Sequence, residues 1–258
     1  MGRTVLPAPG RSGEAYFFHG AKYARIKFRP SSPEEEIVYG PTDIAREWKT
    51  RTSHLRCFSQ TTLLFAWPNS KIKMANIQVV VLVVQAGFST VDAALPVPGH
   101  EGEVYFFSGT RYVRIKFVPG TPEESIVYGP ANIADEWKSL VKAGFETVDA
   151  VLPVPGHPGL AYFFSGNQYA KIAWTPGTPT EEVTFGPRTI VNEWKTLGEA
   201  GFDTIDAVLP VPGHDDQAYF FSGSQYVKIE FVPSSKTEKI LFGPTRITKE
   251  WKTLAWGW

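Results

Sequence analysis

The stretch Asp149-Ala150-Val151-Leu152-Pro153-Val154-Pro155-Gly156-His157, followed shortly by Ala161-Tyr162-Phe163-Phe164, decides the fold because both of its parts recur. The first part returns with small changes from Asp92 and from Asp206, and the second returns at Val104 and Ala218, always 57 residues apart. A further copy of the second part begins at Ala15. A period of this length indicates one supersecondary unit that is repeated four times.

Each unit predicts four strands and a short helix. In the second copy, Tyr112, Arg114 and Lys116 alternate with Val113, Ile115 and Phe117, which is typical of a half-buried strand. Ile133, Trp137 and Leu140 follow at helical spacing after the Gly129-Pro130 turn. The predicted strands of this copy are 91–97, 103–107, 111–118 and 125–128.

Four such sheets arranged around an axis cover one another's faces and leave only short edges. The sequence therefore predicts an all-β fold, a four-bladed β-propeller with a short helix after each blade. We divide the single domain, residues 1–258, into blade 1 (1–50, with a truncated first strand), a non-repeat insert (51–83), blade 2 (84–142), blade 3 (143–199) and blade 4 (200–258).

Composition narrows the possible partners. Lysine plus arginine and aspartate plus glutamate are equal at 26 each, which removes the general electrostatic argument for nucleic acid or an anionic membrane. The longest apolar run, residues 79–84, is far shorter than the roughly 20 residues that span a bilayer. The single cysteine, Cys57, excludes an intramolecular disulfide, and residues 1–10 lack the apolar core of a signal peptide. We therefore expect a cytoplasmic location, and a homodimer is left open.

The repeat resembles a known family. The Asp92-Ala93-Ala94 strand, the Tyr-Phe-Phe-x-Gly-x-x-Tyr-x-x-Ile hairpin from Tyr105 and the Gly-Pro-x-x-Ile segment before Trp137 are similar to hemopexin repeats. The resemblance covers nearly everything outside the insert, and because Cys57 has no partner for a disulfide, the chain looks closest to the cysteine-poor plant albumin-2-like members. Members of this family transport haem, bind matrix proteins, or bind polyamines or haem in legume albumins, so the fold alone does not assign a function.

The insert interrupts the repeat. Tyr16 and Tyr105 are 89 residues apart, 32 more than the period, and residues 51–83 contain no glycine and no acidic residue. We interpret this segment as a translated intron, because joining Thr50 to Val84 through one leucine gives Trp-Lys-Thr-Leu-Val-Gln-Ala-Gly-Phe, which matches Trp137–Phe145. The alternative is a genuine inserted loop, although long loops without a pattern are uncommon inside compact domains.

The family resemblance implies a cation in the central channel, calcium or sodium, held by backbone carbonyls. The carbonyls would come from Asp92, Asp149 and Asp206, with a second layer from Ala94, Val151 and Val208. Blade 1 carries Arg3 at the aspartate position, where its backbone can still offer a carbonyl to the site while its side chain brings a positive charge close to it. In the alternative interpretation, the aspartates cap the strand starts and bind no ion.

A second candidate site is a ring of turns. His100, His157 and His214 each follow a Pro-Val-Pro-Gly turn, and Arg11 follows the corresponding turn of blade 1. These four residues predict a ligand-binding rim of the channel, for an anion or for haem, whose iron can take an imidazole ligand. The alternative is a set of solvated turns copied by duplication.

Two other repeated positions are interpreted structurally. Trp48, Trp137, Trp194 and Trp251 lie on the inner face of each predicted helix and are assigned to the core. The basic stripe, which comprises Arg25, Arg114, Lys171 and Lys228, is expected to be solvated or to pair with carboxylates of a neighbouring blade.

No sequence motif indicates catalysis: there is no nucleophile elbow, no HExxH and no phosphate-binding glycine loop. The prediction is a non-enzymatic binding protein that holds a small ligand or ion (haem, a polyamine or a metal cation) at or near the channel. The alternatives are a carbohydrate-binding or protein-interaction module and a storage albumin.

Overall fold

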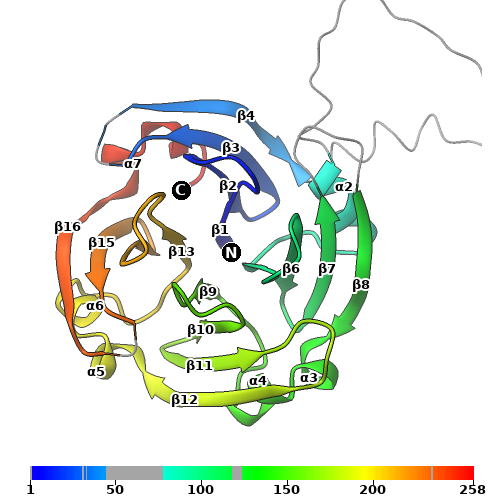
Figure 1. Ribbon diagram of the computed structural model, residues 1–258. Helices are drawn as coiled ribbons and strands as arrows, with labels where there is room; N and C mark the ends of the chain where they lie inside the picture. The colour runs from blue at the N-terminus through cyan, green and yellow to red at the C-terminus, as the bar shows by residue number, and fades with distance from the viewer. Residues whose placement is uncertain (1, 31, 33, 45–77, 118–123, 234) are drawn as a thin grey trace, which may run out of the picture.

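The computed structural model describes residues 2–30, 32, 34–44, 78–117, 124–233 and 235–258. Four antiparallel four-stranded sheets surround a central axis, as Figure 1 shows. Blade 1 comprises β1 (Arg3–Pro7), β2 (Glu14–His19), β3 (Lys22–Phe28) and β4 (Glu35–Asp43); blade 2 comprises β5 (Ala93–Pro96), β6 (Glu103–Ser108), β7 (Arg111–Phe117) and β8 (Glu124–Asn132). Blade 3 comprises β9 (Ala150–Pro153), β10 (Leu160–Ser165), β11 (Gln168–Trp174) and β12 (Glu181–Thr189); blade 4 comprises β13 (Ala207–Pro210), β14 (Gln217–Ser222), β15 (Gln225–Phe231) and β16 (Glu238–Arg246).

The predicted four-bladed propeller is confirmed. Within each blade the strands follow one another in chain order from the axis outward, and β1, β5, β9 and β13 contact their neighbours around the channel. Small residues at the start of these inner strands, such as Ala93 and Ala150, allow four backbones to approach one axis.

The Tyr-Phe-Phe motif is buried on both faces because each second strand is sandwiched between two neighbouring blades. In β10, Phe163 packs against Phe107 of blade 2 with ring centroids 6.4 Å apart. The next residue, Phe164, points to the opposite face and meets Phe220 of blade 4 at 6.3 Å. Alternating side chains of one strand therefore link three blades.

In blades 2, 3 and 4, the predicted helix after the blade is two short pieces. In blade 2, α3 (Ile133–Glu136) and α4 (Lys138–Lys142) are separated by Trp137, whose φ of −96° and ψ of 75° are not helical. Blade 3 repeats this with α5 (Ile190–Glu193) and α6 (Lys195–Glu199), and blade 4 with α7 (Ile247–Glu250) and η2 (Lys252–Leu254). The break lets each Trp leave the helix and enter the junction with the next blade, where Trp137 packs 5.7 Å from Phe163.

In blades 2, 3 and 4, a carboxylate joins the second helical piece to the next blade. Glu181, the first residue of β12, accepts hydrogen bonds from the backbone N–H of Ser139, at 3.0 Å, and from the Ser139 hydroxyl. Thr196 donates to Glu238 in the same way, and Thr253 donates to Glu35 at 2.8 Å and 2.7 Å. We call these three contacts the hydroxyl–glutamate links.

The insert interpretation falls mainly on residues 45–77, which lie outside the described residues, so the translated intron stays a prediction. The chain is described again from α2 (Gln78–Gln85). Val83 occupies the position of Leu140: the backbone N–H of Phe88 donates to the Val83 carbonyl at 3.0 Å, as that of Phe145 donates to the Leu140 carbonyl at 2.9 Å. Leu82 therefore stands where the other junctions have Ser139, Thr196 and Thr253.

Blades 4 and 1 close the ring by packing and polar contacts. Trp258 lies over Phe17 of blade 1 at 5.5 Å and over Phe221 of blade 4 at 5.3 Å. Arg3 of blade 1 reaches Asp206 of blade 4 at 3.5 Å and donates to the Gly223 carbonyl. Among the described residues, no helix is long and apolar enough to cross a membrane.

Candidate functional site in the grooves between blades

The three aspartates predicted to ring the channel each fix a turn of their own blade. The Oδ2 atoms of Asp92, Asp149 and Asp206 accept hydrogen bonds from the backbone N–H groups of Gly109, Gly166 and Gly223, at 2.7, 2.6 and 2.7 Å. Burial raises the pKa of Asp149, the hydrogen bond from Gly166 lowers it in part, and the charges of Asp92 and Asp206 raise it further. The aspartates therefore have a structural role and also share one electrostatic field.

Arg3 occupies the position in blade 1 that is equivalent to the three aspartates. Its guanidinium forms the contact with Asp206 and lies 5.9 Å from the ring of Trp258. Arg3 thus offsets part of the negative charge and at the same time joins the first strand to the last blade.

The four predicted rim residues stay on separate turns. His100 and His157 are exposed, and the Nδ1 atom of each lies near a carbonyl of its own turn, 3.1 Å from Pro98 O and 2.9 Å from Pro155 O. Arg11 is also exposed. Only His214 lines one of the described cavities, and that cavity lies between blades 4 and 1.

These residues do not fit a metal or haem held by side chains. Among the described residues, no group of three His, Cys, Asp or Glu side chains could hold a metal ion. The histidines belong to different turns and do not converge, so the geometry does not support a haem shared by several of them. The predicted cation on the backbone carbonyls of Asp92, Asp149 and Asp206, with Ala94, Val151 and Val208, stays a prediction.

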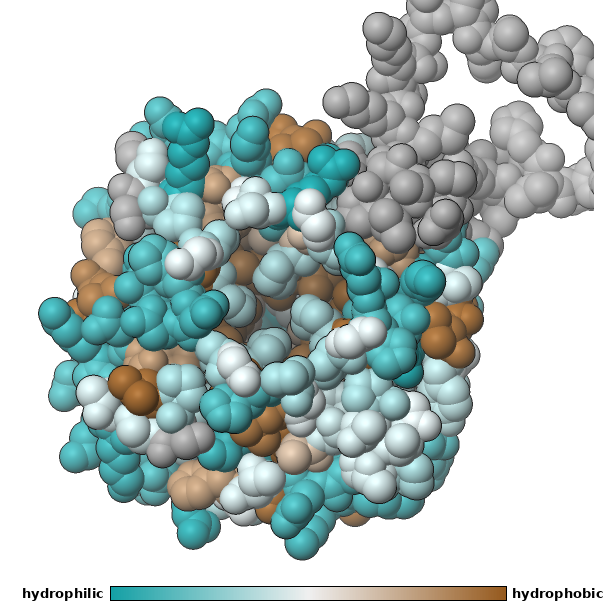
Figure 2. All heavy atoms as spheres, in the orientation of Figure 1, coloured by the Kyte–Doolittle hydropathy of each residue, from teal (hydrophilic) through white to brown (hydrophobic). Residues whose placement is uncertain are grey.

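Cavities open instead between blades, on the side away from the axis. The groove between blades 2 and 3 has a volume of about 380 Å³, that between blades 3 and 4 about 410 Å³, and that between blades 4 and 1 about 740 Å³. We call them groove 2–3, groove 3–4 and groove 4–1. In Figure 2 the axial face is mostly hydrophilic around a central hollow, with brown apolar patches toward the periphery.

The three grooves are built from the same repeat positions. Each is lined by two tyrosines, a basic residue of the third strand, an aromatic residue before the Gly-Pro turn, a glutamate, the junction Trp and the glutamate of the next blade. In this order the residues are Tyr105, Tyr112, Arg114, Tyr128, Glu136, Trp137 and Glu181; Tyr162, Tyr169, Lys171, Phe185, Glu193, Trp194 and Glu238; and Tyr219, Tyr226, Lys228, Phe242, Glu250, Trp251 and Glu35.

The aromatic walls have one geometry. Trp137 is almost perpendicular to Tyr105, with centroids 5.4 Å apart, and Trp251 is perpendicular to Tyr219 at 5.5 Å. The outer aromatic residues are unusually open for their size: Tyr128 is 44% exposed, Phe185 38% and Phe242 44%. Each groove therefore combines a rigid aromatic corner with a solvent-facing ring on which a flat apolar surface can stack.

Polar atoms complete the grooves. Burial is the main factor that raises the pKa values of Tyr112, Tyr169 and Tyr226, so their hydroxyls stay protonated at neutral pH. A phenol O–H can both donate and accept, and a carboxylate such as Glu136 accepts hydroxyl donors. The grooves thus present hydrogen-bonding groups beside aromatic faces.

Three residues of the basic stripe, Arg25, Arg114 and Lys228, are buried, and Arg25 and Arg114 pair within their own blade, which corrects the expectation that the stripe is solvated or paired with a neighbouring blade. Arg114 Nη2 lies 2.6 Å from Glu103 Oε2 of its own blade, and Arg25 Nε lies 3.4 Å from Glu14 of its own blade. The carboxylate comes from the start of the second strand because residues facing the same side of paired strands are adjacent.

The tryptophan assignment is confirmed for three blades, since Trp137, Trp194 and Trp251 are 5–7% exposed. Trp48 lies outside the described residues. The grooves themselves were not predicted from the sequence, although one signal was present: Tyr128, Phe185 and Phe242 repeat an aromatic residue directly before Gly-Pro. Whether such a ring is exposed depends on how far the next blade covers it.

The comparisons with known proteins agree with this architecture. No protein-family model matches the chain. Albumin-2 of Lathyrus sativus is 28% identical over 141 residues, which cover 53% of this chain and 60% of the relative. A 2S albumin seed protein from Dolichos superposes with a TM-score of 0.73 and 23% identity, covering 97% of this chain and 96% of that one. The chain is a hemopexin-fold protein similar to plant albumin-2.

Two solved structures from Cicer arietinum have the same fold as this albumin-2-like chain, each at 21% identity and a TM-score of 0.72. One is described as a plant lectin with two metal binding sites, and the superposition covers 96% of this chain and 94% of the lectin chain. The other is a plant albumin showing hemagglutination and covers 97% and 95%. At this level of identity the likeness establishes the fold alone.

The expected cytoplasmic location is wrong. The similar proteins include albumin-2 and a 2S albumin seed protein, and this finding points away from the cytoplasm. The argument from Cys57 was weak because a chain with a single cysteine forms no internal disulfide in any compartment.

Proposed function

We propose that this albumin-2-like chain is a non-enzymatic carbohydrate-binding protein whose inter-blade grooves each hold a saccharide. The observation that carries the proposal is the recurrence of one aromatic and polar groove at three junctions. The apolar face of a sugar ring can stack on an aromatic side chain, while its hydroxyls donate to carboxylates and phenols.

Repetition adds avidity. Several equivalent sites on one rigid ring can bind several sugars of one surface, which increases the overall affinity without any new contact. The Cicer arietinum relatives described as a lectin and as a hemagglutinating albumin support this proposal.

A glycan array and an erythrocyte agglutination assay test the proposal with a variant that removes only the solvent-facing rings, Tyr128→Ala, Phe185→Ala and Phe242→Ala. Because these residues are 38–44% exposed and lie outside the buried core, the variant should fold. We expect array binding and agglutination to fall at least tenfold, with the melting temperature close to that of the parent.

The matched control is Val141→Ala with Val191→Ala, since these exposed apolar residues line none of the three grooves. The control should bind as the parent does. Full binding by the triple ring variant, or no glycan binding by the parent, would overturn the proposal.

A second candidate is a cation in the channel, favoured by the shared field of Asp92, Asp149 and Asp206. Calcium, sodium or a polyamine would reduce the repulsion that helps to raise the pKa of Asp149. Neutral oxygens bind calcium weakly, with Kd values of about 10⁻⁴ to 10⁻³ M for sites poor in charge. Five millimolar calcium or spermidine should raise the melting temperature of the parent by more than that of Asp149→Asn, and equal shifts would exclude the site.

A further inference from the structure

Lys228 lines groove 4–1, the largest of the three grooves, and among the described residues it lacks the ion-pair partner that Arg25 and Arg114 have at the equivalent positions of blades 1 and 2. The residue is only 9% exposed. In blades 1 and 2 the second strand begins with Glu14 and Glu103, which pair with the basic residue, whereas in blade 4 that position is Gln217. Among the described residues no carboxylate oxygen lies within 4.0 Å of the Lys228 ammonium.

The environment of Lys228 favours an added anion. Burial lowers the pKa of Lys228, and the more distant charges of Asp216 and Glu230 restore only part of it. Its nearest aromatic partner is the ring of Tyr219, 5.8 Å from Nζ. A buried ammonium without a counter-charge gains more from a bound carboxylate than a solvated one does, because both water and salt screen it less.

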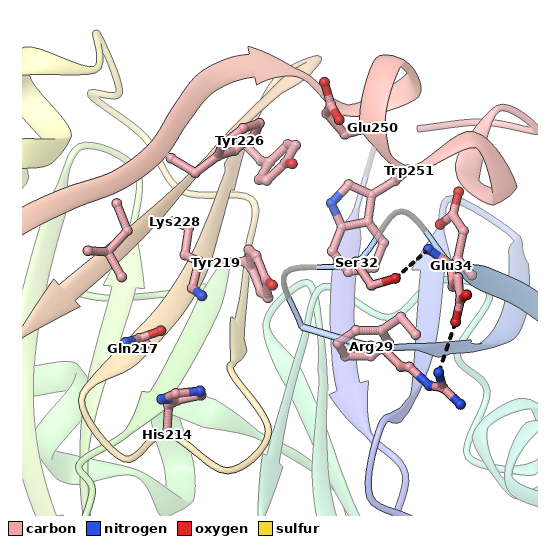
Figure 3. A pocket seen from close by; sticks show the side chains of 14 residues that line it. Arg29, Ser32, Glu34, His214, Gln217, Tyr219, Tyr226, Lys228, Glu250 and Trp251 are labelled. Carbon is pink, nitrogen blue, oxygen red and sulfur yellow. Dashed lines mark hydrogen bonds and ion pairs between the residues drawn. The ribbon is translucent and has the colours of Figure 1, made fainter.

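Gln217 supplies a second unmet group beside Lys228. Its Oε1 is buried and accepts no hydrogen bond among the described residues. Figure 3 shows Gln217 and His214 on the same side of the groove as the Lys228 ammonium, with Tyr219 between this group and Trp251. An acceptor here calls for a ligand that brings a donor, such as a hydroxyl, next to its negative charge.

The carboxylates of this groove are already engaged. Glu35 accepts both hydrogen bonds of Thr253, Glu34 pairs with Arg29 at 3.0 Å, and Glu250 lies 3.7 Å from Lys249. Arg29 and Lys249 offset the negative charges of Glu34 and Glu250, whereas Glu35 keeps its charge and is held in place by Thr253. His214 is exposed at the same groove.

Resting on the proposed carbohydrate function, we infer that groove 4–1 is selective for a carboxylate-bearing sugar, a uronic acid. The carboxylate binds Lys228, a neighbouring hydroxyl donates to Gln217, and the sugar ring stacks on the exposed face of Phe242. Groove 2–3 differs because Glu103 neutralises Arg114. Groove 3–4 differs because Leu160 stands at the position of Gln217 and offers no side-chain acceptor, and because Lys171 is less buried than Lys228.

Isothermal titration at pH 7 and low salt tests this with two matched pairs of sugars, galacturonic acid against galactose and glucuronic acid against glucose. In the parent, at least one uronic acid should bind at least tenfold more tightly than the neutral sugar of its pair. Lys228→Met should abolish that preference, and Lys171→Met, at the equivalent position of blade 3, should keep it. Gln217→Glu, which supplies the missing counter-charge, should abolish the preference by a second route.

The outcomes separate this inference from the proposed function. Equal binding of acid and neutral sugars, no binding of either uronic acid, or a preference that survives in Lys228→Met would overturn the inference while glycan-array binding stands. A blank array would overturn the proposed function itself. If acetate displaces the uronic acid at equal concentration, the site takes a simple carboxylate and the assignment to a sugar is wrong.

Discussion

Groove 2–3 and groove 4–1 are lined by residues at the same repeat positions, but among the described residues the buried basic residue has an ion-pair partner in groove 2–3 and none in groove 4–1. In groove 2–3, Glu103 neutralises Arg114 at 2.6–2.7 Å. In groove 4–1, Gln217 replaces the carboxylate, and Lys228 is left with more distant charges. The comparison shows that a repeat can keep its fold while one substitution in a supporting residue changes the electrostatics of a surface groove.

The largest expected effect comes from breaking the pair in groove 2–3. Arg114→Met leaves the part-buried Glu103 without its counter-charge, which should lower the free energy of unfolding by about 3 kcal/mol. Urea denaturation measures this change. Lys116→Met, an exposed residue two positions along the same strand, should change stability by less than about 0.5 kcal/mol. If the two variants are equally stable, the pair does not neutralise Arg114 in the way we describe.

The hydroxyl–glutamate links should contribute equally to stability at the two grooves. Comparing them tests whether the grooves differ only in the charge of the basic residue or whether one junction is weaker as a whole. Ser139→Ala acts beside groove 2–3 and Thr253→Val beside groove 4–1. Each removes one donor to a part-buried carboxylate and should cost about 1–2 kcal/mol. A difference larger than about 1 kcal/mol between the two variants in thermal or urea unfolding would mean that the junctions differ beyond the charge of Lys228.

Lys228→Met should change the free energy of unfolding in the opposite direction from Arg114→Met. It removes a buried cation without an ion pair and should stabilise the chain by about 1 kcal/mol at pH 7. The folded pKa of Lys228 lies below its ordinary value of 10.5, so the unfolded chain holds this proton more tightly and the penalty fades as the pH rises toward 10.5. The advantage of the variant should therefore shrink between pH 7 and pH 10.5, and an advantage that grows would contradict the assigned pKa shift.

Much of the fold could be predicted because the repeat records it directly. The Tyr-Phe-Phe strand, the Gly-Pro turn and the Trp recur at a fixed period, so the strand order and three of the core tryptophans follow from the sequence. The hydroxyl–glutamate links were not predicted, because Ser139 and Glu181 belong to different blades and meet only when the ring closes.

The candidate site was harder to predict than the fold. The sequence directed attention to His100, His157 and His214 because they are chemically versatile and repeated. Their turns nevertheless keep them apart, and among the described cavities only groove 4–1 includes one of them. The grooves are made by tyrosines, glutamates and basic residues that look like ordinary strand positions. These residues form a site because a space is left between two blades. The pattern of residues within one blade does not predict that space.

The smallest expected effect concerns the junction between blades 1 and 2. This junction can be compared with the three that have a hydroxyl–glutamate link. Leu82 stands at the position of Ser139, Thr196 and Thr253, and it has no hydroxyl to offer to Glu124, the first residue of β8. Deleting residues 51–82 together with Val83→Leu, as the translated-intron interpretation requires, would place Thr50 there. A restored link should stabilise the chain by about 1 kcal/mol.

The control for this deletion carries Thr50→Ala as well, so that it shares the shorter chain and lacks the hydroxyl. Thermal unfolding should rank the deletion variant above its Ala control, and both should remain monodisperse propellers. Sequencing of transcripts should find messages in which the codons for 51–82 are absent and the flanks are joined through leucine. If every transcript retains the segment, or if the deletion variant melts below the parent, the segment is a genuine part of the protein. Leu82 is then the residue that this junction uses in place of a link, by apolar packing against Val83 and the core of blades 1 and 2.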